Sequence, residues 1–226
     1  MIEHNDAEQV TVYVVDDDEA VRASLDMLLS SVSLNVETYA SGQDFLANWK
    51  PERPGVLLVD LRMPGMSGLE LQQKLVAAGH RIPIIFISAH GDVSSAVRAM
   101  RTGADEFLTK PFGEEVLLDR IQKAIRAELS QRESERKHSK VRAHYDTLTP
   151  RQREVLECVV AGKSNKEIAR ELDISVKTVE LHRGQMMSRM AAQSIADLVK
   201  MHMELRQAEQ PPARARKIAS EQQPSL

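Results

Sequence analysis

Three short runs of consecutive apolar residues constrain the fold of this chain more strongly than any other feature. They lie at residues 11–15, 56–59 and 84–87. Apolar runs without polar alternation are typical of strands that are buried on both faces of a parallel sheet. Residues 35–39 and 106–108 are weaker strand candidates, and we expect these two strands nearer the edges of the sheet.

Helical patterns alternate with these runs, so we predict a doubly wound α/β domain over residues 10–128. The expected helices span about residues 19–31, 41–48, 67–78, 92–101 and 114–129. Because the connections between parallel strands are right-handed, all strand carboxyl ends lie on one side of the sheet. We expect five parallel strands in the flavodoxin-like order 2-1-3-4-5.

Polar side chains that suit phosphoryl chemistry follow the predicted strands. Asp16, Asp17, Asp60, Ser88 and Lys110 each come where a strand ends, and open parallel sheets bind ligands at this edge. Asp60 is the candidate nucleophile towards phosphorus. Ser88 can donate a hydrogen bond to a phosphoryl oxygen, and Lys110 can neutralise another one. The alternative is a set of solvated loop carboxylates and a surface lysine.

The carboxylates also form a candidate metal site, because a cluster of hard oxygen ligands suits Mg²⁺ (or Mn²⁺). We expect Asp17 to bind the ion directly and Asp16 to bind it directly or through water. Asp60 and the backbone carbonyl of Arg62 are the expected further ligands. A carboxylate beside such an ion can form an acyl phosphate.

Three segments resemble the receiver domain of two-component response regulators: Val14-Val15-Asp16-Asp17, Asp60-Leu61-Arg62-Met63-Pro64-Gly65 and Lys110-Pro111-Phe112. The resemblance covers about residues 10–128 and implies that Asp60 is the phosphoacceptor. It implies that Ser88 and Phe107 switch conformation together. It also implies a cis bond between Lys110 and Pro111, a geometry that is essentially confined to proline.

Composition and charge limit the possible classes of protein. The chain has 226 residues, 42% of them hydrophobic, and a single cysteine, so it has room for two domains and no internal disulfide. We expect a soluble cytoplasmic protein with no membrane partner, because no apolar run approaches the ~20 residues of a membrane span. We expect Cys158 to pack in a core.

Charge is distributed unevenly along the sequence. Residues 1–126 contain 12 Lys and Arg against 19 Asp and Glu, whereas residues 127–226 contain 18 against 14. An acidic half followed by a basic half is typical of a cation-binding module joined to a nucleic-acid-binding one. Uneven surface charge without a function is the alternative.

Residues 129–146 are the predicted linker, because the apolar periodicity stops after Leu129. We expect a loose tether; the alternative is an extension of the preceding helix, which a pair between Glu133 and Lys137 supports. Residues 207–226 contain three prolines and dispersed charge, and we expect this tail to be disordered.

The region between linker and tail has four clear helix starts. We expect helices at about residues 150–161, 165–172, 176–190 and 195–205. Thr149 and Ser164 begin capping boxes, and Ser175 caps the third of these helices. The turn of residues 173–175 has the length found in helix-turn-helix motifs.

Three stretches resemble the LuxR-type DNA-binding domain: residues 148–156 (Leu-Thr-Pro-Arg-Gln-Arg-Glu-Val-Leu), 162–169 (Gly-Lys-Ser-Asn-Lys-Glu-Ile-Ala) and 175–183 (Ser-Val-Lys-Thr-Val-Glu-Leu-His-Arg). The resemblance covers residues 143–206 and implies a DNA-binding domain at 147–206. The domain order and the segment Ser88-Ala89-His90-Gly91-Asp92 look most like the FixJ subgroup of response regulators.

The helix at 176–190 has the two faces that a recognition helix needs. We expect Val176, Val179, Met186 and Met190 to pack inward, leaving a polar face for the major groove. Glu180 can accept from a cytosine amino group and Leu181 can contact a thymine methyl, while Lys166, Lys177 and Arg183 suit phosphates. The full set of DNA-binding candidates is Asn165, Lys166, Lys177, Thr178, Glu180, Leu181, Arg183 and Gly184.

These observations favour a phosphorylation-activated transcriptional regulator. A sensor histidine kinase phosphorylates Asp60, the receiver dimerises, and the helix-turn-helix domain binds double-stranded promoter DNA, with RNA polymerase as a further partner. The chain is then no enzyme beyond its own phosphorylation and dephosphorylation. One alternative is a phosphohydrolase that uses an aspartyl phosphate; such enzymes have a second Asp where this chain has Arg62. Another is a DNA-binding protein whose receiver works without phosphorylation.

Overall fold

The computed structural model describes residues 10–89 and 93–208, and residue contacts divide the chain after Arg132 into two compact units. Residues 90–92, which belong to the FixJ-like segment, lie outside the described residues. So do residues 209–226, which make up most of the tail that we expect to be disordered.

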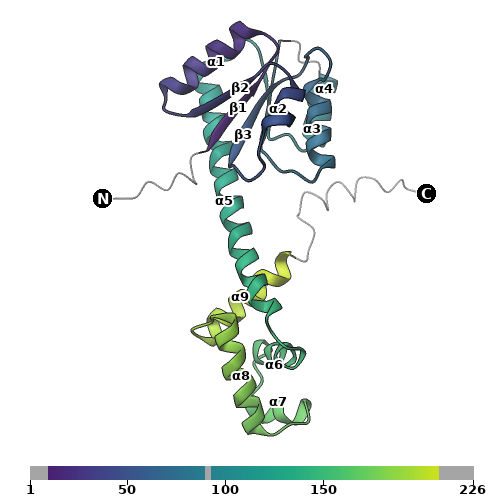
Figure 1. Ribbon diagram of the computed structural model, residues 1–226, viewed down its shortest axis with the longest axis vertical. Helices are drawn as coiled ribbons and strands as arrows, with labels where there is room; N and C mark the ends of the chain where they lie inside the picture. Colours follow the sequence, from purple (N-terminus) through teal and green to yellow (C-terminus); the bar gives the residue numbers. More distant parts are fainter. Residues whose placement is uncertain (1–9, 90–92, 209–226) are drawn as a thin grey trace, which may run out of the picture. The chain divides into compact units, whose positions relative to one another are not determined.

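The first unit is built on five parallel strands in the order β2-β1-β3-β4-β5 (Figure 1). The strands are β1 (Thr11–Val15), β2 (Asn35–Tyr39), β3 (Gly55–Asp60), β4 (Ile84–Ser88) and β5 (Glu106–Thr109). The predicted order is confirmed, and the two weaker strand candidates are the two edge strands. The carboxyl ends of all five strands therefore share one edge of the sheet.

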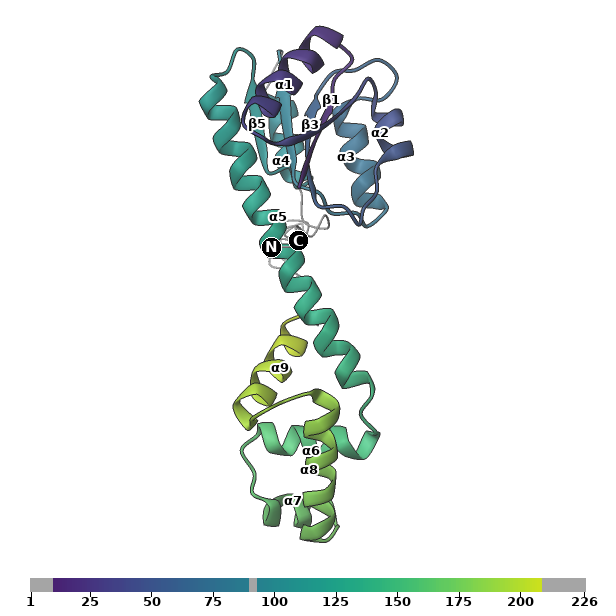
Figure 2. The same cartoon turned by 60° about the vertical axis from the view of Figure 1, so that its left-hand side comes forward.

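Helices cover both faces of this sheet (Figure 2). They are α1 (Glu19–Ser31), α2 (Gly42–Asn48), α3 (Gly68–Ala77), α4 (Val93–Arg101) and the first part of α5 (Glu114–Asp146). Alternate residues of β1 take opposite faces: Tyr13 packs with Phe45 of α2 and Leu71 of α3, whereas Val14 packs with Leu29 of α1. Two covered faces explain why the strand sequences are apolar without alternation.

Helix α5 extends further than the sequence pattern predicts. The expected end at residue 129 is wrong, because the helix runs to Asp146 and takes in all of residues 129–146. The expected loose tether is therefore wrong, and the alternative, an extension of the preceding helix, is confirmed. Residues 114–146 contain no Gly or Pro, and the predicted pair between Glu133 and Lys137 forms at 2.6 Å. A polar helix without these breaking residues can continue even where it packs against nothing.

Arg132 is the last residue of α5 within the first unit. Its guanidinium donates hydrogen bonds to the backbone carbonyls of Pro51, Glu52 and Arg53, and pairs with the carboxylate of Glu128 at 2.5 Å. These bonds tie this part of α5 to the loop before β3.

The second unit consists of the end of α5 and four further helices. These are α6 (Pro150–Val160), α7 (Asn165–Glu171), α8 (Val176–Met190) and α9 (Ile195–Ala208). The predicted capping boxes at Thr149 and Ser164 are confirmed, and Ser175 caps α8. The core includes Val141 of α5 together with residues of every other helix: Val155, Leu156, Ile168, Val179, Met186, Met190 and Leu198.

Two further sequence predictions have different outcomes in this core. Cys158 is buried and free, so its expected packing role is confirmed. The prediction that Val176 packs inward is wrong, because its side chain is 39% exposed. Val176 is the first residue of α8, one turn before the buried Val179. At this end of the helix the inner face extends beyond the core. Among the described residues, no helix is long and apolar enough to cross a membrane.

The structure predicts opposite effects for alanine at two glycines. A Cβ at Gly68 lies 2.4 Å from the backbone oxygen of Asp60, whereas a Cβ at Gly184 meets no atom within 4 Å. We expect Gly68→Ala to lower the free energy of unfolding by about 1–3 kcal/mol through overpacking. Gly184→Ala should raise it by about 1 kcal/mol through helix propensity.

Urea denaturation with two probes checks this pair. Trp49 is the single tryptophan and packs in the core of the first unit, so its fluorescence reports the unfolding of that unit. Circular dichroism reports the loss of helix in both units. An unchanged fluorescence midpoint in Gly68→Ala would contradict the clash at the backbone of Asp60.

Candidate functional site

Lys110 brings two carboxylates together at the carboxyl edge of the sheet. Its Nζ atom lies 3.1 Å from Oδ2 of Asp16, after β1, and 3.5 Å from Oδ1 of Asp60, at the end of β3. All three side chains are largely buried, with 24%, 5% and 12% of their side-chain surface exposed. Residues 94 positions apart in the chain thus meet where the strand ends converge.

Backbone groups hold both carboxylates in place. The backbone N–H of Arg62 donates to Oδ2 of Asp60 at 2.6 Å, and the backbone N–H of Asp18 donates to Oδ1 of Asp16 at 2.9 Å. The guanidinium of Arg22 donates to the backbone carbonyl of Asp16 at 2.8 Å. Arg22 lies one turn into α1, and sequence reasoning missed its role, although its spacing from the cap residue Asp18 is a usable signal.

Burial raises the pKa of the Asp60 carboxyl above its ordinary value. The negative charge of Asp16 adds to this shift, whereas the hydrogen bond from Arg62 and the ammonium of Lys110 oppose it. Two carboxylates therefore share one positive charge, and the ionised form of Asp60 is disfavoured in the absence of another cation.

The donor set fits a divalent cation in part. Asp16 and Asp60 supply carboxylate oxygens in a site where negative charge is in excess, which suits a hard cation. The side chain of Asp17, the expected direct ligand, is exposed at the adjacent position. Over residues 10–89 and 93–208, no three His, Cys, Asp or Glu side chains are gathered closely enough to form a ready metal cage. The structure thus brings together two of the three predicted metal-binding carboxylates.

Ser88 and Phe107 lie on the neighbouring strands. Ser88 is 2% exposed at the end of β4, and its backbone carbonyl accepts a hydrogen bond from the backbone N–H of Lys110 at 2.8 Å. The bond between Lys110 and Pro111 is cis, as the resemblance implies. Phe107 of β5 is half-buried, with its ring centroid 6.2 Å from that of Phe86.

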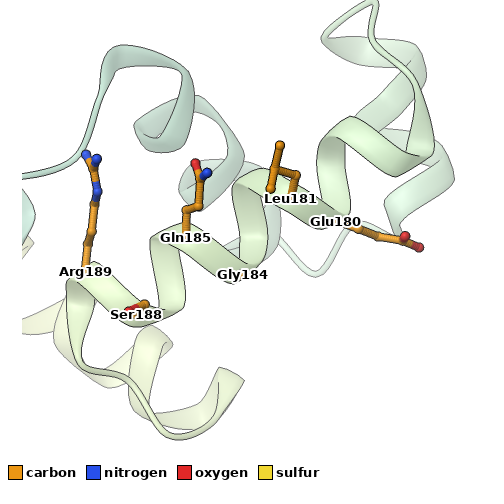
Figure 3. A pocket seen from close by; sticks show the side chains of 6 residues that line it. All are labelled: Glu180, Leu181, Gly184, Gln185, Ser188 and Arg189. Atoms are coloured by element: carbon orange, nitrogen blue, oxygen red, sulfur yellow. The ribbon is translucent and has the colours of Figure 1, made fainter.

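A second candidate site lies on the exposed face of α8 (Figure 3). A hollow of about 490 Å³ is lined by Glu180, Leu181, Gly184, Gln185, Ser188 and Arg189. Three predicted DNA-binding residues, Glu180, Leu181 and Gly184, therefore share one surface. Leu181 is 58% exposed there.

The remaining DNA-binding candidates lie around this surface rather than in it. Lys166 of α7 and Lys177 of α8 are exposed, whereas Asn165, Thr178 and Arg183 are half-buried. The hydroxyl of Thr178 lies 2.8 Å from that of the cap residue Ser175. Arg183 does not line the hollow, so the structure does not place it with the predicted base-reading residues.

Sequence reasoning missed the second contact of Gln152. Gln185 and Arg189 also line this surface, and neither is among the predicted DNA-binding residues. The buried side chain of Gln152 contacts both of them, at 3.0 and 3.1 Å. The capping box at Thr149 identified Gln152, but only as a partner within α6.

Comparisons with known proteins cover both units. Residues 12–122 match the family model described as response regulator receiver domain, and residues 146–202 match that of bacterial regulatory proteins of the luxR family. The chain is 45% identical to the response regulator protein TmoT of Ectopseudomonas mendocina over 197 residues, which is 87% of this chain and 89% of that protein. It is 44% identical to the transcriptional regulatory protein FixJ of Rhizobium meliloti (strain 1021), over 84% of this chain and 94% of that one.

Comparison with solved structures also finds a response regulator. The structure of the response regulator StyR is similar with a TM-score of 0.81 and 43% identity, covering 87% of this chain and 99% of that chain.

The raised pKa of Asp60 predicts how stability depends on pH. A carboxyl whose pKa is raised by folding binds its proton more tightly in the folded state. The folded state therefore loses stability as pH rises from the ordinary pKa through the raised one. In EDTA we therefore expect Asp60→Asn to be more stable than the wild type at pH 7, and the difference to vanish below pH ~3.9, the ordinary pKa of Asp. Thermal unfolding at both pH values measures this, with the exposed Asp119→Asn as the control for loss of one charge. A less stable Asp60→Asn at pH 7 would show that the hydrogen bond and the ion pair outweigh burial.

Proposed function

The chain belongs to the response regulators that join a receiver domain to a LuxR-type DNA-binding domain, and from this premise we propose that phosphorylation of Asp60 controls its activity as a transcriptional regulator. The observation that carries the proposal is the shared contact of Asp16 and Asp60 with Lys110. A carboxylate that is short of positive charge, at the ligand-binding edge of the sheet, suits a phosphoryl acceptor.

In the proposed reaction, a carboxylate oxygen of Asp60 attacks the phosphorus of a phosphohistidine on a sensor histidine kinase. The phosphorus–oxygen bond forms, the phosphorus–nitrogen bond breaks, and the imidazole leaves with the electron pair. Lys110 lies close enough to Asp60 to pair with an oxygen of the attached phosphoryl group. Ser88 is the expected hydroxyl donor to another oxygen.

A divalent cation, Mg²⁺ or Mn²⁺, supplies neutralisation of the phosphoryl oxygens when it is bound. Asp16, Asp17, Asp60 and the backbone carbonyl of Arg62 are the groups that would hold it. The exposed side chain of Asp17 has room to turn towards the ion, whereas Asp16 is already engaged by Lys110.

The chain's own catalysis is then limited to gaining and losing this phosphoryl group. Phosphohydrolases that work through an aspartyl phosphate place a second Asp two residues after the nucleophile, as acid/base. This chain has Arg62 there, and its backbone N–H donates to Asp60. A receiver that works without phosphorylation is the other alternative, and the grouping of Asp16, Asp60 and Lys110 counts against it.

We place the DNA contact on the exposed face of α8. Glu180 and Leu181 face outward and can reach base edges of the major groove. The exposed Lys166 and Lys177 flank this face at the helix starts, where they suit phosphates. Promoter DNA is thus the proposed ligand, with RNA polymerase as the partner on which regulation acts.

The receiver also offers a surface for dimerisation. Val93, Val97 and Met100 lie at positions i, i+4 and i+7 of α4 and are 80%, 49% and 45% exposed. Arg101 ends the same helix and is also exposed. Because β5, which carries Phe107, follows α4 directly, a change at Ser88 and Phe107 can alter this face. A twofold dimer would match an inverted repeat and link two recognition helices.

The acceptor is tested by mass spectrometry of the intact protein. Acetyl phosphate with Mg²⁺ should add one phosphoryl group to the wild type, EDTA should prevent it, and Asp60→Asn should remain unmodified. Asp17→Ala should weaken Mg²⁺ binding more than Asp16→Ala, since Asp17 is the expected direct ligand. Full labelling of Asp60→Asn would refute the assignment of the acceptor.

Dimerisation is tested by light scattering and DNA titration together. The wild type should be monomeric before phosphodonor treatment and dimeric after it, with a matching gain in affinity for DNA. Arg101→Glu should block the dimer and leave labelling of Asp60 intact, whereas Arg81→Glu, an exposed position before β4, should change neither. A phosphorylated monomer with the full gain in DNA affinity would contradict this part of the proposal.

A further inference from the structure

Gln152 is a buried amide that joins the start of α6 to the exposed face of α8. Gln152 is 1% exposed. Oε1 of Gln152 accepts hydrogen bonds from the backbone N–H of Thr149 at 3.1 Å and from Nη1 of Arg189 at 3.1 Å. Its Nε2 atom donates to Oε1 of Gln185 at 3.0 Å. Both ends of this amide are therefore engaged.

The chemistry of these partners fixes which way the amide of Gln152 points. A backbone N–H and a guanidinium can only donate, so the group facing them has to be the carbonyl oxygen. A flipped amide would set its NH₂ group against two donors and lose both bonds inside the protein. The NH₂ group of Gln152 therefore always faces Gln185.

The orientation of Gln185 follows in turn. A donor on Gln152 requires an acceptor opposite it, so Gln185 turns its Oε1 inward and its own NH₂ group away from Gln152. Gln185 is exposed and lines the hollow on α8, between Leu181 and Arg189 (Figure 3). A free glutamine can turn either its oxygen or its NH₂ group towards DNA, whereas the bond from Gln152 favours the orientation with the NH₂ group outward.

Arg189 belongs to the rigid frame of this arrangement. Its Nη1 atom also donates to the backbone carbonyl of Thr147 at 2.7 Å, and its own carbonyl lies 3.0 Å from a ring nitrogen of His144. The guanidinium thus joins α8 to the segment between α5 and α6, which keeps the oxygen of Gln152 occupied.

We propose that Gln152 is a positioning residue that fixes the orientation of the Gln185 amide, so that Gln185 turns its NH₂ group towards DNA. This inference rests on the proposed DNA-binding function. A donor-only group selects acceptors, namely N7 or O6 of guanine, N7 of adenine, O4 of thymine or a phosphate oxygen. It rejects the amino group of cytosine. A free Gln185 could bind either hydrogen-bond donors or acceptors of DNA. The buried amide of Gln152 makes it selective for acceptors.

Gln152→Glu in the full chain is the direct test. Glutamate has the same shape and keeps an oxygen for Thr149 and Arg189, but it presents an acceptor where Gln152 has a donor. Gln185 then has to rotate its amide and present its oxygen to DNA. Wild type and variant, both treated with acetyl phosphate and Mg²⁺, select binding sites from a random duplex library. We expect the variant to change its preference towards cytosine or adenine at one position of each half-site, and to bind the wild-type site about tenfold more weakly.

A second substitution separates this effect from the added negative charge. If Gln152 acts through Gln185, then Gln152→Glu should weaken binding about tenfold in the wild type and hardly at all in a Gln185→Ala background. Gln185→Glu, which keeps an acceptor for Gln152, should reproduce the new base preference without altering the buried frame.

The possible results of these binding experiments lead to different conclusions. Loss on every sequence with no change of motif, but only when Gln185 is present, supports the inference and identifies the acceptor as a phosphate oxygen. Equal losses with and without Gln185 overturn it, as does unchanged binding by a Gln152→Glu variant that melts like the wild type. A wild type that selects no sequence overturns the proposed DNA-binding function, and this inference with it.

Discussion

The ammonium of Lys110 is the interaction on which the functional edge of the first unit depends. Asp16 and Asp60 are brought close by the parallel sheet, in surroundings where little water remains to separate their charges. Like charges repel strongly in such surroundings, and one cation between them offsets much of that cost. The backbone N–H of Lys110 bonds to Ser88, so the same residue that balances the carboxylates also joins the ends of β4 and β5. A group added at Asp60 would change the charge balance of both carboxylates around Lys110.

Sequence patterns predicted this edge because a simple rule connects strand ends to space. Each buried strand shows as an apolar run, and parallel connections place every following residue on one side of the sheet. The rule fails where a residue lies outside a core. Helix α5 continues past residue 129 without an apolar stripe, so periodicity did not show it. Val176 has the right spacing for the inner face of α8 but lies beyond the residues that this face packs against.

The link from Gln152 to Gln185 shows a second limit. The pattern Thr149–Gln152 predicted one half of the side chain's contacts, because a capping box lies within one helix. The other half reaches Gln185, 33 residues along the chain. Whether two polar side chains from different helices meet depends on how the helices pack. The sequence pattern of one helix does not predict this packing. Buried polar groups nevertheless need partners, so the burial of a glutamine is itself a reason to look for a second contact.

Cys158 carries a consequence for the kind of signal that this chain can receive. It is the single sulfhydryl of the sequence and is 5% exposed, and burial together with the charge of Glu171 raises the pKa of its thiol. A protonated, enclosed thiol neither attacks electrophiles nor reacts readily with peroxides. Disulfide formation between folded copies of the protein through Cys158 is therefore disfavoured. Association between folded copies then depends on non-covalent contacts.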